Sequence, residues 1–202
     1  CDYAFYVGAA VENTSELAEL ERLPGCAGVK MFMGASTGSL LVADDEDVRN
    51  VLRSGRRRMA VHSEDQARLL QRKALADAGG VARHPEWRDA ESALLATQRL
   101  LRMARQAHRL VHVLHVTTAQ EIALLASHKD IASVEVTPQH LTLAAPEAYA
   151  QLGTRAQMNP PIRDASHRAA LWDGIANGVV DVLGSDHAPH TLEEKAKEYP
   201  AS

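Results

Sequence analysis

The sequence predicts an α/β fold in which parallel strands alternate with crossover helices. Short apolar segments alternate along the chain with longer amphipathic ones, which is the pattern of strands joined by helices. The chain has 202 residues, of which 46% are hydrophobic, so it can bury a sizeable core. It contains no internal repeat, low-complexity segment or linker. We therefore expect a single domain over residues 1–202.

Six short apolar segments are predicted strands: Tyr3–Val7, Gly28–Met33, Met59–His62, Val111–Val116, Ser133–Thr137 and Val180–Ser185. The first has the composition of a buried strand. Five amphipathic stretches are predicted helices: Asp45–Arg53, Glu64–Ala78, Ala90–Ala107, Ala119–Ser127 and His167–Asn177. Strand–helix units in series are typical of a (β/α) barrel or of a doubly wound sheet.

A closed (β/α) barrel has eight strands and a typical length of about 250 residues. Six strands leave two edges unpaired, and natural sheets normally cover or blunt such edges. The sequence also begins at Cys1 rather than at a Met. We therefore expect an incomplete barrel of about six units, cut from a longer protein.

Composition excludes several classes of partner. The net charge is -4, and Lys and Arg are scattered, so the chain lacks the basic patch of a protein that binds nucleic acid or an anionic membrane. Two cysteines are too few for a disulfide framework. The sequence shows no apolar run of about 18 residues and no signal peptide. These features predict a cytoplasmic protein that acts on a small molecule.

Polar residues stand at the ends of four predicted strands. Lys30, His62, His115 and Asp186 follow apolar runs in this way. Taken singly, each residue also has a purely structural interpretation. A lone His at a strand end is commonly a hydrogen-bonded structural residue, and a Lys in an apolar strand can extend its amine to the rim of the barrel. In a parallel barrel, however, the strand ends converge on one mouth, where functional residues lie. Imidazole and carboxylate together suit zinc, so the set predicts a metal site.

Six segments resemble dihydroorotase of the amidohydrolase superfamily, in the order of that family and over nearly the whole chain. They are residues 28–38 (GVKMFMGASTG), 61–65 (VHSED), 112–117 (HVLHVT), 134–141 (VEVTPQHL), 158–163 (MNPPIR) and 184–195 (GSDHAPHTLEEK). The resemblance implies a TIM barrel with a small appended β-sandwich. Hydantoinases and allantoinases share the lysine and histidines but usually differ around the final Asp.

The resemblance also implies roles for the strand-end residues. Lys30 matches a lysine that is carboxylated and bridges two zinc ions, which requires an amine pKa below the usual value of about 10.4. His62 and His115 match ligands of the more exposed metal. Asp186 matches a ligand of the other metal that also shuttles a proton.

Four further residues match substrate-binding positions. Asn159 and His190 correspond to residues that hold the dihydroorotate ring and its carboxylate, although Asn159 before two prolines is also a common turn residue. Ser36 and Thr37 lie in a segment that is expected to close over the substrate, or that is simply a loop.

The remaining histidines are expected to be structural or exposed. His140 lies in PQHL, where the family often has a second His in place of Gln139, and we expect a structural or supporting role. His112 is expected to pack in the core. Four others are expected to be solvated: His84, His108, His128 and His167.

The family resemblance implies a zinc-dependent dihydroorotase that interconverts dihydroorotate and N-carbamoyl-aspartate in pyrimidine synthesis. It also implies a homodimer, with aspartate transcarbamoylase as a possible partner. Two alternatives stay open: a dihydropyrimidinase, hydantoinase or allantoinase, and a non-catalytic homologue that supports aspartate transcarbamoylase. No His-x-His-x-Arg motif, which opens the barrel in the family, precedes Tyr3. We therefore expect the 202-residue chain itself to be inactive.

Overall fold

The computed structural model of the protein describes residues 1–36 and 40–201. Within them, six parallel strands form one sheet in the order in which they follow one another along the chain. They are β1 (Phe5–Gly8), β2 (Cys26–Phe32), β3 (Met59–His62), β4 (Val111–Val113), β5 (Ala132–Val136) and β6 (Val182–Leu183). A doubly wound sheet reverses its strand order at a switch point, whereas a barrel wall does not. The order therefore excludes the doubly wound alternative and confirms the incomplete barrel.

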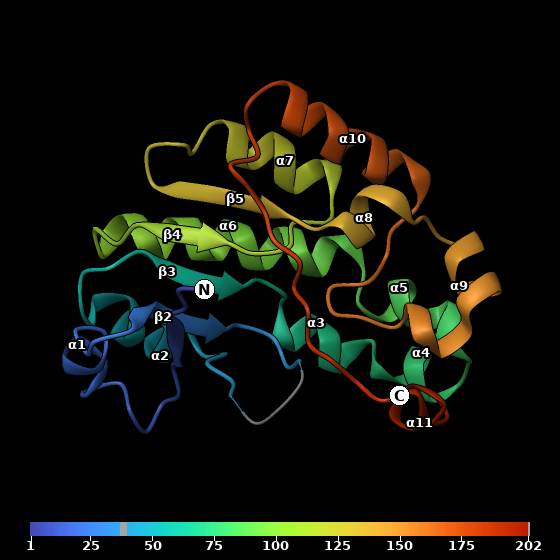
Figure 1. The fold of residues 1–202 in the computed structure, drawn as a ribbon, viewed down its shortest axis with the longest axis horizontal. Coiled ribbons are helices and arrows are strands. Elements are labelled where there is room, and N and C mark those ends of the chain that lie inside the picture. Colours follow the sequence, from blue (N-terminus) through green and yellow to red (C-terminus); the bar gives the residue numbers. More distant parts are fainter. Residues whose placement is uncertain (37–39, 202) are drawn as a thin grey trace.

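Helices follow the strands and cover one face of the sheet (Figure 1). The longer ones are α2 (Asp45–Arg53), α6 (Ala90–Gln106), α7 (Ala119–Ala126) and α10 (Ala165–Ala176). Shorter elements are α1 (Leu17–Leu20), α3 (Gln66–Gln71), α4 (Lys73–Asp77), α5 (His84–Trp87), α8 (Pro138–Thr142), α9 (Glu147–Leu152), α11 (Leu192–Lys195) and the 3-10 turns η1 (Val81–Arg83) and η2 (Gly153–Ala156).

The two faces of the strands differ sharply in polarity. Val29, Val61 and Val134 are fully buried in the core cluster shared with the helices. Because side chains alternate along a strand, Lys30 and His62 lie on the opposite, inner face. That inner face of β2 to β5 also carries further polar side chains: His112, Ser133 and Glu135. The apolar face thus holds the helices in place, and the polar face is left for chemistry.

Polar caps fix where α6 and α7 begin. The Asp89 side chain accepts a hydrogen bond from the Ser92 amide at the start of α6, and Thr118 accepts one from the Glu121 amide at the start of α7. These bonds satisfy amides that the first helical turn leaves free. The predicted helices in these regions are therefore confirmed to within a residue or two.

Three expectations about elements are wrong. The stretch Glu64–Ala78 is not one helix, because the chain breaks between α3 and α4 at Arg72, which has a ψ of 0°. The predicted strands Val111–Val116 and Val180–Ser185 are both shorter, at Val111–Val113 and Val182–Leu183. The first strand is not buried, since Phe5 and Tyr6 are 69% and 52% exposed at the edge of the sheet.

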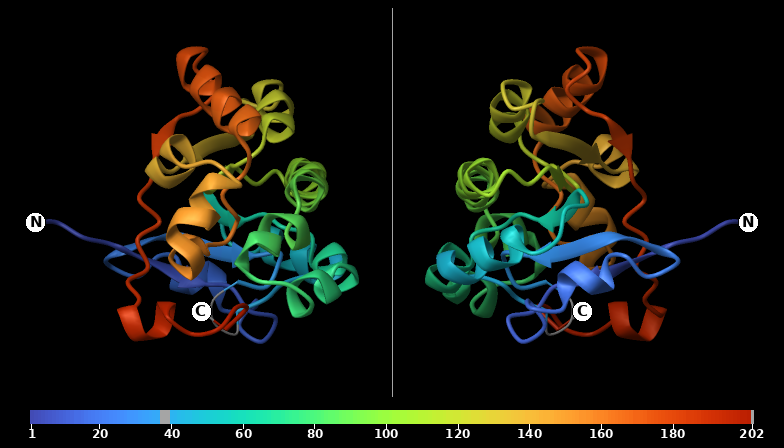
Figure 2. Two further views of the ribbon diagram at one scale, coloured as in Figure 1. Left: turned by 90° about the vertical axis from the view of Figure 1, so that its right-hand side faces the viewer. Right: turned by 90° about the vertical axis from the view of Figure 1, so that its left-hand side faces the viewer.

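The edge strands β1 and β6 border the open side of the sheet, where the C-terminal segment also lies (Figure 2). Figure 2 shows the N-terminal residues extending away from the body, and the chain after β6 running past the open side of the sheet to α11. In the described residues β1 and β6 are not paired with each other, so the sheet is open. None of the described helices is both long and apolar enough to cross a membrane.

Candidate active site

The four residues predicted at strand ends come from β2, from β3 and from the segments after β4 and β6, with Lys30 two residues before the end of β2. Lys30 pairs with Ala60 across β2 and β3, which places it one layer below His62. His115 and Asp186 follow the ends of β4 and β6 in left-handed conformations, with φ of 38° and 46°. A left-handed backbone costs roughly 1 to 3 kcal/mol in a non-Gly residue, and residues held in this conformation cluster at functional sites.

The two predicted imidazole ligands face each other. His62 Nδ1 lies 3.1 Å from His115 Nε2, and both rings are almost fully buried. The ring planes cross at 75° with centroids 4.8 Å apart. The two histidines therefore direct ring nitrogens at each other within hydrogen-bond distance, although His115 lies beyond the end of its strand.

A buried carboxylate orients His62. Its Nε2 lies 2.8 Å from Glu64 Oε2, so His62 donates its proton there, and its Nδ1 lone pair accepts a hydrogen bond from His115 Nε2. Burial alone would raise the pKa of Glu64, but the Arg88 guanidinium and His62 outweigh it and hold that pKa far below its usual value. Glu64 is thus a permanent anion behind the first imidazole.

Burial also keeps both imidazoles neutral. It lowers the pKa of His62, with Glu64 acting against the change and Arg88 and Lys30 adding to it. Burial lowers the pKa of His115 further, helped by the nearby His62 and Lys30. A neutral imidazole is the form that binds a metal.

Lys30 has the unusual amine that its predicted modification needs. Burial lowers the pKa of Lys30 to about 8, against the attraction of Asp186 and Glu135. Its Nζ lies 4.5 Å from the centre of the Phe32 ring, two residues further along the same face. At neutral pH a sizeable minority of such amines is unprotonated and nucleophilic, unlike an exposed lysine.

Asp186 and Glu135 supply the acidic side of the site. Burial raises the pKa of Asp186, as does Glu135, while Lys30 opposes the change. Glu135 accepts a hydrogen bond from the backbone amide of His115 at 3.3 Å. Gly184 makes this arrangement possible, because a Cβ there would lie 2.3 Å from the Glu135 carboxyl carbon.

The residues fit a metal in part. Two nitrogens bound to one tetrahedral zinc at about 2.0–2.1 Å lie about 3.3 Å apart, close to the 3.1 Å between His62 and His115. His115 Nδ1 is buried without a hydrogen-bond partner among the described residues. In the same part of the chain, no three His, Cys, Asp or Glu side chains are grouped closely enough to hold a metal. Lys30 lies near enough to both imidazoles to lower the pKa of each, so it is a candidate for a further ligand.

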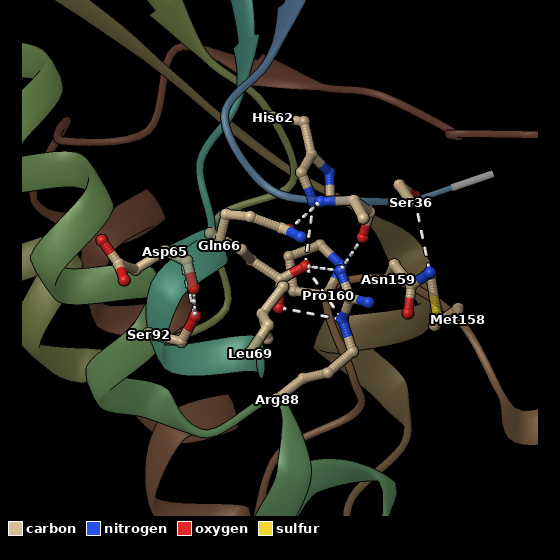
Figure 3. Close-up of polar contacts among 12 residues, drawn as sticks. Ser36, His62, Asp65, Gln66, Leu69, Arg88, Ser92, Met158, Asn159 and Pro160 are labelled. Carbon is tan, nitrogen blue, oxygen red and sulfur yellow. Dashed lines mark hydrogen bonds and ion pairs between the residues drawn. The ribbon is translucent and has the colours of Figure 1, made fainter. Parts of the chain in front are cut away.

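Two of the predicted substrate residues meet at a separate cleft. The Asn159 amide lies 3.4 Å from Ser36 Oγ, as Figure 3 shows, and both residues line a cleft of about 300 Å³. Thr37 lies outside the described residues. His190 is exposed and lies 3.7 Å from Glu194, so the structure does not bring it to the other site residues.

His84 is not solvated, contrary to expectation. It is 1% exposed, with Nε2 donating to the Met158 carbonyl at 2.9 Å and lying 3.1 Å from Asn159 Oδ1. The Asn159 oxygen is therefore turned towards His84 and its NH2 group towards Ser36. The expectation failed because residues 84 and 159 are far apart in sequence.

The other histidines follow the predictions more closely. His140 is buried between Thr137 Oγ1 at 2.7 Å and the Pro160 carbonyl at 3.0 Å, which confirms a structural role. His112 is buried beside Ser133. His108 is exposed, whereas two others are partly buried: His128 and His167.

Comparison with known proteins places these observations in a family. The chain is 31% identical over 209 aligned positions to a dihydroorotase of Methanosarcina mazei, covering 96% of this chain and 45% of the relative. It is 37% identical over 141 positions to a dihydroorotase of Halobacterium salinarum, covering 68% of this chain and 32% of the relative. An L-hydantoinase (dihydropyrimidinase) structure from Arthrobacter aurescens superposes with a TM-score of 0.87 at 27% identity, covering 96% of this chain and 45% of that one. No family model matches the chain.

The chain belongs to the cyclic amidohydrolases of the amidohydrolase superfamily. It spans less than half of the length of the relatives just named. At this site, sequence analysis missed Glu64, Arg88 and Glu135. Glu64 had a usable signal, an acid two residues after a strand-end histidine, but Arg88 is 24 positions from its carboxylate partner and gave none.

Proposed function

We propose that the protein, at its full natural length, is a metal-dependent dihydroorotase that interconverts dihydroorotate and N-carbamoyl-aspartate in pyrimidine synthesis. The observation that carries the proposal is the facing pair of ring nitrogens, His62 Nδ1 and His115 Nε2, at the strand ends beside Lys30. The sequence relatives named above are dihydroorotases, which supports this substrate over other cyclic amides.

Zinc is the proposed metal, two ions per complete site. His62, His115 and a carboxylated Lys30 would hold one ion, and the same Lys30 group with Asp186 would contribute to the other. The chemistry that zinc supplies is Lewis acidity towards the ring carbonyl and a lower pKa for water. Carboxylation needs the unprotonated amine of Lys30, which its lowered pKa favours.

The chain's own residues would move the proton and hold the ring. Asp186 Oδ would take a proton from the attacking water and return it to the ring nitrogen that leaves. The pKa of Asp186 is raised and so lies closer to neutral pH, which suits a general acid–base catalyst. The Asn159 NH2 group, turned away from His84, would donate to an oxygen of the substrate, and Ser36 would lie beside it.

The test is a comparison of two substrates and one variant. The protein at its full natural length should open dihydroorotate faster than hydantoin. Asp186→Asn should lower kcat by roughly 10²-fold or more while much of the bound zinc is retained. Near-wild-type turnover of Asp186→Asn would refute the mechanism.

Hydantoin hydrolysis is the second candidate activity, because a hydantoinase structure superposes along nearly the whole chain. A higher kcat/KM for hydantoin than for dihydroorotate would favour it. No turnover of either ring by the zinc-loaded protein would favour a non-catalytic homologue.

We also propose a homodimer in the cytoplasm, with aspartate transcarbamoylase as a further partner. Light scattering of the pure protein tests the first association, and co-purification with the transcarbamoylase tests the second. A monomer that elutes alone would contradict both.

A further inference from the structure

Arg88 is a buried cation that follows helix α5 and reaches into the centre of the site region. Its side chain is 3% exposed, and the carboxylate of Glu64 opposite is fully buried. Figure 3 shows Arg88 extending towards His62 from the side opposite the strands. A guanidinium in such a place must be fully paired, because an uncompensated buried charge costs several kcal/mol.

The guanidinium is shared between two partners. Its Nε donates to Glu64 Oε1 and Oε2 at 3.2 and 3.1 Å, and its Nη2 also bonds Glu64 Oε2. The same Nη2 donates to the Ala35 carbonyl at 2.7 Å. One planar group therefore ties the strand-end carboxylate to the segment that follows β2.

Each partner leads directly to one half of the site. Glu64 holds His62 Nε2 at 2.8 Å and so fixes which nitrogen His62 presents. Ala35 precedes Ser36, whose hydroxyl faces the Asn159 amide. The Ala35 amide is held from the other side by Gln66 Oε1 at 2.8 Å. The Arg88 side chain contacts both Glu64, which leads to His62, and Ala35, which leads to Ser36.

We propose that Arg88 is a positioning residue that sets the orientation of His62 through Glu64 and the position of Ser36 through Ala35, so that the metal side and the substrate side are aligned together. The inference rests on the proposed function, since it assigns His62 to a metal and Ser36 to the substrate cleft. Arg88 itself touches neither.

The physical basis is the geometry of the guanidinium. Its fork can bond two oxygens of Glu64 and a third acceptor at once, which an ammonium on a flexible stem does not reproduce. A carboxylate behind a metal-binding histidine fixes the tautomer and raises ligand basicity, and losing it typically costs about 10- to 100-fold in metal affinity. Loss of Arg88 removes the group that keeps Glu64 in that position.

The experiment measures zinc affinity without substrate, by competition with a chelator, in the metal-free protein at its full natural length. Arg88→Met should weaken zinc binding by about 10-fold or more and also raise KM for dihydroorotate. Arg88→Lys keeps a charge beside Glu64, so it should recover most of the zinc affinity while KM stays raised. Arg68→Met is the matched control: Arg68 pairs with Asp89 and Glu91 nearby, away from Glu64 and Ala35. It should leave zinc affinity unchanged even if Tm falls.

The outcomes separate this inference from the proposed function. Wild-type protein that binds no zinc would refute the proposed function. Wild-type protein that binds zinc, with Arg88→Met binding it equally well, would refute the positioning role alone, whatever its Tm. If Arg88→Met fails to fold, Glu64→Gln combined with Arg88→Met removes both buried charges, and it should fold yet bind zinc about 10-fold more weakly. Wild-type zinc affinity in that double variant would contradict the inference.

Discussion

Lys30 is the residue on which the proposed chemistry depends most. It is placed by the alternation of β2, and burial lowers its amine pKa to about 8. Sequence analysis located Lys30 because an amine in an apolar strand is conspicuous. It could not show which acids lie near it, since Glu135 lies in β5 and Asp186 follows β6, both more than 100 residues later.

We predict that Lys30→Ala abolishes dihydroorotate turnover, and that short carboxylic acids such as acetate partly restore it by supplying the missing carboxylate. Steady-state rates with and without the acid measure this. Lys197→Ala, which changes an exposed lysine outside the cleft that Ser36 and Asn159 line, is the control and should keep wild-type activity. Full activity of Lys30→Ala without added acid would contradict the role.

His84 should make stability depend on pH. Burial lowers the pKa of His84 to about 4, whereas the unfolded chain has a value near 6.5. Between these values the unfolded state binds the proton and the folded state does not, so stability is full above pH 6.5 and falls as pH drops towards 4. From pH 7 to pH 5 this group should cost about 2 kcal/mol.

Urea unfolding at the two pH values, for wild type and His84→Gln, isolates this contribution. The wild-type protein should lose more stability than the variant, which lacks the titrating group but retains the other buried histidines. Equal losses in the two proteins would show that His84 does not titrate as proposed.

At the scale of elements, the loop between α2 and β3 is built around one buried carboxylate. Glu21 accepts hydrogen bonds from the Arg56 backbone amide at 2.6 Å and from the Arg109 guanidinium at 2.9 Å. Gly55 lies in the loop with φ of +75°, and a Cβ there would lie 2.5 Å from the Glu21 carboxylate. The position thus demands both a left-handed backbone and the absence of a side chain.

We predict that Gly55→Ala destabilises the protein by about 3 kcal/mol, the sum of backbone strain and displacement of Glu21. Gly25→Ala is a matched control, because Gly25 has φ of +79° but open space where its Cβ would be. It should cost about 1 kcal/mol from the backbone alone. Urea unfolding measures both, and equal losses would contradict the steric argument.

The elements themselves were predictable in proportion to their length. Helix α2 has the predicted bounds, Asp45–Arg53, and α6 ends within one residue of its prediction, because both have periodic apolar residues and α6 also begins at the Asp89 cap. Helices α5, α8 and α9 were missed, since four to six residues give too few turns for a pattern. The short β4 was overestimated because Val116 continues the apolar run after the chain has already turned at His115.

At the scale of the whole molecule, strand order was the decisive unknown. Alternating strands and helices fit two architectures equally well, and local patterns do not encode which strands pair. The sequential order β1 to β6 settles the architecture. It also explains why the polar residues converge, since parallel neighbours bring all their carboxyl ends to one rim.

We predict that the 202-residue chain on its own binds at most one zinc ion and does not turn over dihydroorotate. It holds the proposed ligands Lys30, His62 and His115 of one metal, but its sequence has no His-x-His-x-Arg motif for the other. Elemental analysis and a dihydroorotate assay of the purified chain measure both properties. Two tightly bound zinc ions with measurable turnover would contradict the ligand assignment.

The central claim is that His62 and His115 hold a metal between their facing nitrogens. Crystals of the zinc-loaded protein at its full natural length, measured at the zinc absorption edge, test it most directly. The account predicts an anomalous peak about 2.0–2.1 Å from both His62 Nδ1 and His115 Nε2, with connected density at Lys30. A peak bound elsewhere, or the two imidazoles still paired to each other without a peak, would contradict it.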